Sequence, residues 1–286
     1  MSIGSHIGIQ SSLSKSLNYA LSLGITSPQF FFGSPYKLQR KQFKAEDLEQ
    51  CGEISCNCFV HCPYVINFAG VASSNTIAWD GCENTDEKVK ECILSVQSDL
   101  ETCDKLRHCK KGCVVHVGSI GKNKDWEKGC KAVATSINKL VFDSTPLLIE
   151  TMVGRGGVLG KNFDELALMY NSIQDRDHVG FCLDTCHVFA EGLFDLGTNT
   201  GIDECFAEFD SKIGLQYLKA VHLNDSMDGF ASKKDHHQGL CKGEIWKNRD
   251  KALCYFLQRC KALDLPVILE TTPDDIPLLI EYNKES

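Results

Sequence analysis

The stretch VGFCLDTC, residues 179–186, decides the fold class, because its apolar run is continuous and ends in an acidic residue. Strands buried on both faces of a parallel sheet have this pattern. Seven similar runs occur at SHIGI (5–9), QFFFG (29–33), CNCFVHC (56–62), GCVVHVG (112–118), PLLIETM (146–152), LKAVHLND (218–225) and PVILETT (266–272). The eight runs predict eight parallel strands.

Segments with apolar residues three and four positions apart separate these runs, and they predict helices. They lie at 13–25, 87–106, 126–141, 164–173, 203–213 and around 252–257. Eight strands alternating with helices over about 250 residues predict one (β/α)8 TIM barrel, of the α/β class. We expect this barrel to be a single domain spanning residues 1–286. A doubly wound open sheet is the alternative, but its GxGxxG fingerprint is missing.

Composition excludes several classes of protein. The chain has 286 residues, 43% of them hydrophobic and 24% charged, which is typical of a globular protein and not of a disordered one. Its apolar runs are far shorter than the about 20 residues that cross a bilayer. The start of the chain lacks a signal-peptide pattern, so we expect an intracellular protein of the cytoplasm, the nucleus or a viral compartment. In such a compartment the 16 cysteines should be reduced and mostly packed in the core.

Polar side chains follow the apolar runs at one end. They are His61, His116, Glu150, Asp184, His187, His222, Asp235, His237 and Glu270. In a barrel of this type the carboxyl ends of the strands meet on the active face. One histidine or carboxylate there is usually a hydrogen-bonding or helix-capping residue. Nine such residues at successive strand ends instead predict a metal site on this face.

The residue types indicate the metal and its chemistry. Four carboxylates buried together repel one another unless cations are present. Imidazole and carboxylate ligands without thiolate favour zinc, with manganese or iron as alternatives. Nine ligands exceed the three or four of one catalytic zinc ion, so we expect two or three ions that share a bridging carboxylate. Clusters of this kind support phosphoryl transfer.

Four motifs carry a family resemblance. They are HCPYVIN (61–67), CLDTCHVFAEG (182–192), VHLND (221–225) and the D-x-H pair at 235–237. With these motifs the sequence resembles the endonuclease IV family of apurinic/apyrimidinic (AP) endonucleases, from IGSH (3–6) to PVILET (266–271). The resemblance implies hydrolysis of the phosphodiester 5′ to an abasic site in base-excision DNA repair, leaving a 3′-hydroxyl and a 5′-deoxyribose phosphate. It also implies removal of 3′-blocking groups.

The resemblance implies three zinc ions. The ligand sets are His61, His116 and Glu150 for the first ion; Glu150, Asp184, His222 and Glu270 for the second; and His187, Asp235 and His237 for the third. Glu150 bridges the first two ions, and Glu150, Asp184 and Glu270 are the expected catalytic residues. A net charge of −8 alone disfavours binding to nucleic acid, but bound cations give this face a positive local field.

The resemblance also implies a partner and a set of DNA contacts. The partner is double-stranded DNA with abasic or 3′-blocked sites, bound by a monomer without a nucleotide cofactor or a membrane. Expected DNA-contacting residues are Tyr64 and Val65 in the inserting loop, Tyr36 and Lys37 in place of a family arginine, and His236 and Lys242 near the third site. Lysine supplies charge without the guanidinium fork, so insertion by the loop at 33–37 is an open question.

Other interpretations stay open at this point. Sugar isomerases and epimerases share metal-binding parallel barrels, but they use one or two ions and lack the third ligand set. A non-catalytic module that binds damaged DNA or a partner protein would need no metal and should have lost ligands. Cys182 and Cys186 flank Asp184 and could ligate metal or form a redox pair, although packing is the favoured interpretation.

Overall fold

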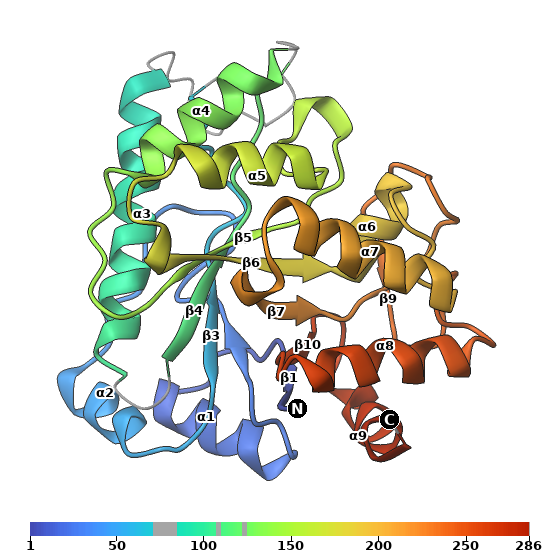
Figure 1. Ribbon diagram of the computed structural model, residues 1–286. Coiled ribbons are helices and arrows are strands. Elements are labelled where there is room, and N and C mark those ends of the chain that lie inside the picture. Colours follow the sequence, from blue (N-terminus) through green and yellow to red (C-terminus); the bar gives the residue numbers. More distant parts are fainter. Residues whose placement is uncertain (71–84, 107–109, 122–124, 286) are drawn as a thin grey trace.

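The structure, a computed structural model, describes residues 1–70, 85–106, 110–121 and 125–285. Eight strands form one parallel sheet in the order β1-β10-β7-β6-β5-β4-β3-β2. A parallel bridge between His6 and Gln29 joins the two outer strands, and the amide of Ile7 donates to the carbonyl of Gln29 at 2.8 Å. The sheet is thereby closed into a barrel, with helices around it (Figure 1). The predicted fold is confirmed.

The strands follow the predicted apolar runs. They are β1 (Ile3–Ser5), β2 (Gln29–Phe30), β3 (Cys58–His61), β4 (Lys110–Val115), β5 (Leu147–Glu150), β6 (Val179–Asp184), β7 (Leu218–His222) and β10 (Val267–Leu269). The prediction for the first strand, 5–9, is displaced along the chain, since Ile3 to Ser5 pair with β10. Ile7 lies beyond β1 but is buried, and its amide makes the bond to Gln29 that helps to close the barrel. Its apolar character therefore reflects burial at this closing contact.

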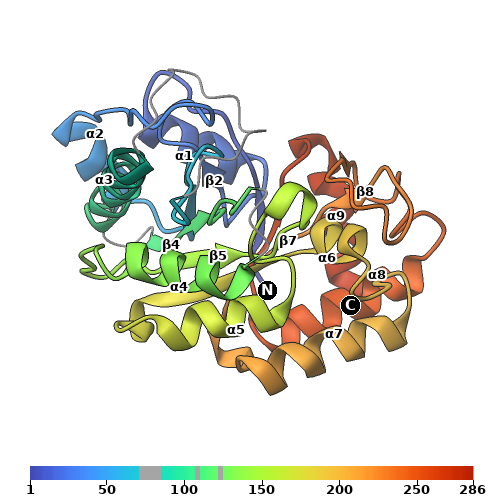
Figure 2. The ribbon, with the colours of Figure 1, turned by 90° about the horizontal axis from the view of Figure 1, so that it is seen from above.

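The helices surround the strands when the barrel is seen from above (Figure 2). They are α1 (Leu13–Ser22), α2 (Ala45–Gly52), α3 (Thr85–Asp104), α4 (Trp126–Ile137), α5 (Phe163–Ser172), α6 (Thr185–Glu191), α7 (Asn199–Lys212), α8 (Asp250–Ala262) and α9 (Ile276–Glu285). Short 3-10 turns lie at Arg155–Gly157, Arg176–His178, Leu215–Tyr217 and Pro273–Asp275, and β8 (Asp225–Ser226) pairs with β9 (His237–Gln238) in an antiparallel hairpin. The hairpin and helices α2, α6 and α9 had not been predicted.

The barrel interior holds a compact apolar layer. It contains one side chain from each of six strands: Phe59, Val114, Leu148, Cys182, Ala220 and Ile268. All are buried. A second and larger core lies between the strands and the helices. Cys182 belongs to the interior layer, which agrees with its expected packing role.

Removing a side chain from this layer should destabilise the barrel. We expect Leu148→Ala to lower the free energy of unfolding by about 2–5 kcal/mol, because it opens a cavity in a close-packed interior. The control is Leu94→Ala on α3, whose side chain is 67% exposed. Urea denaturation measures both variants, and equal losses from them would contradict this view of the interior.

No disulfide joins the described cysteines, and all of them except Cys241 and Cys254 are buried. Their burial agrees with the expected packing in the core. Within the described ranges, no helix has the length and apolar character needed to span a bilayer.

Candidate metal centre

The predicted ligands form the next layer of the barrel interior. Side chains alternate between the two faces of a strand, so residues two apart point to the same side. Six ligands lie two positions after the members of the interior layer: His61, His116, Glu150, Asp184, His222 and Glu270. The apolar layer therefore closes the barrel beneath the ligands and keeps them at the carboxyl end of the strands.

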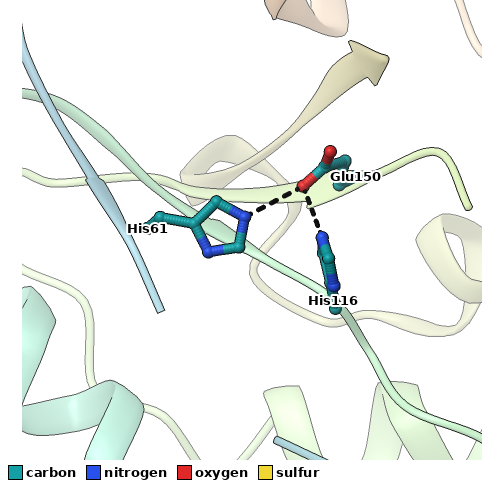
Figure 3. A group of neighbouring side chains, drawn as sticks. All are labelled: His61, His116 and Glu150. Atoms are coloured by element: carbon teal, nitrogen blue, oxygen red, sulfur yellow. Dashed lines mark hydrogen bonds and ion pairs between the residues drawn. The ribbon is translucent and has the colours of Figure 1, made fainter. Parts of the chain in front are cut away.

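The first group contains His61, His116 and Glu150. Nε2 of His61 and Nε2 of His116 lie 3.3 Å and 3.0 Å from Oε2 of Glu150. Figure 3 shows both imidazole rings directed at this one oxygen. Burial raises the pKa of Glu150, but the rings of His222 and His116 outweigh it and hold that pKa well below its usual range. The carboxylate is therefore ionised and available to cations.

The second group uses the other oxygen of Glu150. Nδ1 of His222 lies 2.9 Å from Oε1 of Glu150 and 3.3 Å from Oε2 of Glu270. Asp184 completes the group, whose ligand atoms lie within 4.8 Å of one another. Burial raises the pKa of Asp184. Glu270 is also buried, but the neighbouring imidazoles lower its pKa to about 2. Three carboxylates in such contact need compensating positive charge.

The third group contains His187, Asp235 and His237. The Nε2 atoms of the two histidines lie 3.0 Å and 3.1 Å from Oδ1 of Asp235. Both nitrogens are buried and face this oxygen, but neither contact has the geometry of a hydrogen bond. Buried polar atoms are nearly always satisfied, so the convergence of two such nitrogens on one carboxylate oxygen fits a shared cation.

Hydrogen bonds on the outer side of the rings support the same conclusion. Nδ1 of His61 lies 2.7 Å from the carbonyl of Cys62, and Nδ1 of His187 lies 2.6 Å from that of Thr151. A carbonyl only accepts, so each Nδ1 carries a proton and each Nε2 is left to face its group. Metal-binding histidines in proteins are commonly oriented in this way. The residues present therefore fit metal ions.

Two buried amides had not been singled out from the sequence. The Gln29 side chain donates to Oε1 of Glu270 at 2.9 Å, and its Oε1 accepts from Nε2 of His222 at 2.9 Å. The Asn224 amide donates to Asp184 at 2.6 Å and to Glu270 at 3.0 Å. Gln29 is the first residue of a predicted strand, and Asn224 lies in the quoted VHLND motif. Neither position in the sequence indicates which side chains the amide contacts.

Four of the predicted DNA-contacting residues lie in two adjoining loops, one of which brings Tyr64 beside the first group. The Tyr64 side chain packs against His61 and His116, with ring centroids 5.1 Å and 5.2 Å away, and it is 40% exposed. Val65 next to it is half-buried. Tyr36 and Lys37 are exposed, and the Tyr36 ring lies 6.0 Å from that of Tyr64.

The other two predicted contacts have carboxylate partners. Nδ1 of His236 lies 2.8 Å from Asp228, within the loop of the β8–β9 hairpin. Nζ of Lys242 lies 2.7 Å from Asp275. Both side chains are more than half exposed, so each could face a ligand while it keeps its partner. The Cys186 thiol lies near Asp184 and His237 as a further group with metal-ligand spacing, and the role of this cysteine stays open.

Comparison with known proteins agrees with the geometry. A family profile described as "Xylose isomerase-like TIM barrel" matches residues 17–277. A probable endonuclease 4 of Methanosphaera stadtmanae is 33% identical over 281 aligned positions, which cover 96% of this chain and 94% of that protein. The chain belongs to the endonuclease IV family. The resemblance seen in the sequence is thereby confirmed, and the chain is an enzyme of the endonuclease type, a hydrolase.

Other members of the endonuclease IV family also match along most or all of their length. A putative endonuclease 4 of Acanthamoeba polyphaga mimivirus is 31% identical over 298 aligned positions, covering 99% of this chain and 90% of that protein. The crystal structure of endonuclease IV from Thermus thermophilus matches with a TM-score of 0.80 and 26% identity, covering 100% of both chains.

Proposed function

We propose that this chain is a zinc-dependent AP endonuclease of base-excision DNA repair. It would hydrolyse the phosphodiester 5′ to an abasic site and leave a 3′-hydroxyl and a 5′-deoxyribose phosphate. The observation that carries the proposal is the convergence of nine side chains into three adjoining groups, in a chain whose relatives are named endonuclease 4. Removal of 3′-blocking groups is the same hydrolysis at the end of a strand.

Each of the three groups would hold one zinc ion. The ligands are His61, His116 and Glu150; Glu150, Asp184, His222 and Glu270; and His187, Asp235 and His237. When bound, zinc ions supply Lewis-acid stabilisation of phosphate oxygens and a nucleophile from water near neutral pH.

The side chains of the protein set the positions for this chemistry. Glu150 belongs to two groups, with Oε2 facing one and Oε1 the other, so it fixes their separation. Gln29 and Asn224 hold the two oxygens of Glu270, and Asn224 also holds Asp184. Hydrogen bonds of this kind restrict the ligands to one geometry before substrate arrives. We therefore propose Glu150, Asp184 and Glu270 as the catalytic carboxylates.

We propose that Tyr64 and Val65 contact the DNA at the lesion, with Tyr36, Lys37, His236 and Lys242 around them. A missing base lowers the cost of unstacking the abasic nucleotide, which favours binding to damaged DNA. Tyr64 presents a partly exposed ring next to His61 and His116, and the exposed ring of Tyr36 lies beside it. The partner would be duplex DNA, bound by a monomer inside the cell.

Tyr64→Ala should weaken binding to an abasic duplex roughly tenfold, and binding to an undamaged duplex much less, because base–aromatic stacking contributes about 1–3 kcal/mol. Fluorescence anisotropy with both duplexes measures the difference. Tyr19→Ala on α1, where the side chain is similarly exposed, is the control. Equal losses on the two duplexes would make Tyr64 a general contact rather than a lesion contact.

Sugar isomerisation is the competing activity for this fold. Such enzymes need fewer ligands, whereas here His187, Asp235 and His237 form a third group beyond the four-ligand one. The site therefore favours the phosphodiesterase.

The direct test uses a duplex with one natural abasic site. We expect a cut on the 5′ side and a 3′ end that a DNA polymerase extends without further processing. A duplex ending in a 3′-phosphoglycolate should likewise become extendable. Fragments with a 3′ end that blocks the polymerase would indicate β-elimination and would contradict hydrolysis.

A further inference from the structure

A buried ion pair lies outside the metal groups. Nε of Arg40 lies 2.9 Å from Oδ1 of Asp99 on α3, and the two side chains are 3% and 1% exposed. Burying two charges is costly, and apolar residues of similar volume often replace such pairs without loss of stability. A contribution to stability alone is therefore a weak explanation for the presence of this buried ion pair.

Arg40 also binds the turn that follows β2. Its Nη1 lies 3.4 Å from the carbonyl oxygen of Ser34 and 3.3 Å from that of Lys37. The guanidinium therefore reaches both ends of the four-residue turn Ser34–Lys37. The hydroxyl of Ser95, also on α3, donates to the carbonyl of Leu38 at 2.7 Å. Helix α3 thus holds the turn through Arg40, and it holds the residue that follows the turn through Ser95.

The segment that carries Tyr64 also contacts this turn. The amide of Tyr64 donates to the carbonyl of Pro35 at 2.8 Å. The ring of Phe31 packs edge-on against that of Tyr64, with centroids 5.1 Å apart. Tyr36, in the middle of the turn, projects a ring that is 64% exposed beside Tyr64. The position of the turn therefore sets the distance between the two exposed rings.

We infer that Arg40 and Asp99 are positioning residues for lesion recognition, which hold the Ser34–Lys37 turn so that Tyr36 and Tyr64 present one preformed aromatic surface. The ligand of this surface is a nucleobase that has lost its stacking partner next to the abasic site. Stacking on aromatic rings is tolerant of base identity, and a preformed surface loses less conformational entropy on binding. The inference rests on the proposed function, but it concerns binding of DNA rather than hydrolysis.

The test replaces both charges together, as Arg40→Met/Asp99→Leu, so that neither is left buried alone. This variant keeps the side-chain volume and loses the hydrogen bonds to the turn. We expect unchanged zinc content, kcat within about twofold of the original, and KM for an abasic duplex raised about tenfold. A 2-aminopurine next to the abasic site should also show weaker quenching on binding. The control is Arg259→Met/Asp203→Leu, which replaces an ion pair between α8 and α7. This control variant should leave KM unchanged.

Two results with the folded double variant would overturn the inference. One is an unchanged KM, and the other is a parallel fall of kcat, zinc content and affinity, which indicates general damage. If the double variant does not fold, Arg40→Lys decides, because one ammonium nitrogen keeps the charge but cannot replace both Nε, which faces Asp99, and Nη1, which faces the two carbonyls. A threefold or larger rise of KM supports the inference, and no rise contradicts it. An original protein that does not cut abasic DNA refutes the proposed function instead.

Discussion

Glu270→Gln is expected to lower the rate of incision by at least about 10³-fold and to leave binding of an abasic duplex within about threefold. The substitution removes one negative charge from the four-ligand group while it keeps the shape of the side chain. Glu270 lies 3.3 Å from His222 and accepts hydrogen bonds from Gln29 and Asn224, so the change acts inside the group. Single-turnover incision and anisotropy measure the two effects separately.

The matched control for this substitution is Glu165→Gln. Glu165 is also buried, but it accepts hydrogen bonds from the amides of Gly160 and Lys161, away from the metal groups. We expect this variant to cut at close to the original rate. If Glu270→Gln also cuts at the original rate with its metal retained, Glu270 is not a catalytic ligand.

Removing the metal should abolish incision, and adding zinc should restore it. After dialysis against a chelator we expect at least about a 10³-fold loss of rate, since the Lewis-acid chemistry is lost. The melting temperature should fall as well, because a ligand present at 1,000 times its Kd stabilises the folded state by about 4 kcal/mol. The buried carboxylates of Glu150, which contacts His222, and Asp184, which contacts His237, then lack the cation that compensates their charge.

Titration of the metal-free protein with zinc gives the sharper readout. Activity should return in proportion to bound zinc and reach its plateau at three ions per chain. Glu150→Gln should plateau below this number, because Glu150 belongs to two groups. Full activity in a metal-free preparation would contradict the metal centre.

The clustering of six of the nine candidate ligands could be predicted from the sequence because these six obey the period of a strand. Phe59 and His61, or Leu148 and Glu150, are two residues apart, so an apolar interior residue is followed by a polar one on the same side. Parallel strands then bring these ends together without any knowledge of loops. The same regularity explains why the barrel and its carboxyl-end site were predictable.

The supporting contacts depend on pairings that are distant in the chain. Gln29 meets Glu270 across 241 positions, and Arg40 meets Asp99 across 59. The closure of the barrel produces the first contact and the packing of α3 produces the second, and neither leaves a local pattern. The β8–β9 hairpin pairs only two residues from each strand, which is too short for a periodic signal.

The central proposal is that this barrel hydrolyses DNA at an abasic site when it holds three metal ions. Its most direct test is incubation of purified, metal-analysed protein with a duplex that carries one tetrahydrofuran abasic analogue, which cannot undergo β-elimination. We predict incision on the 5′ side by protein that contains three zinc ions per chain. An intact duplex after incubation with fully zinc-loaded protein would contradict the account.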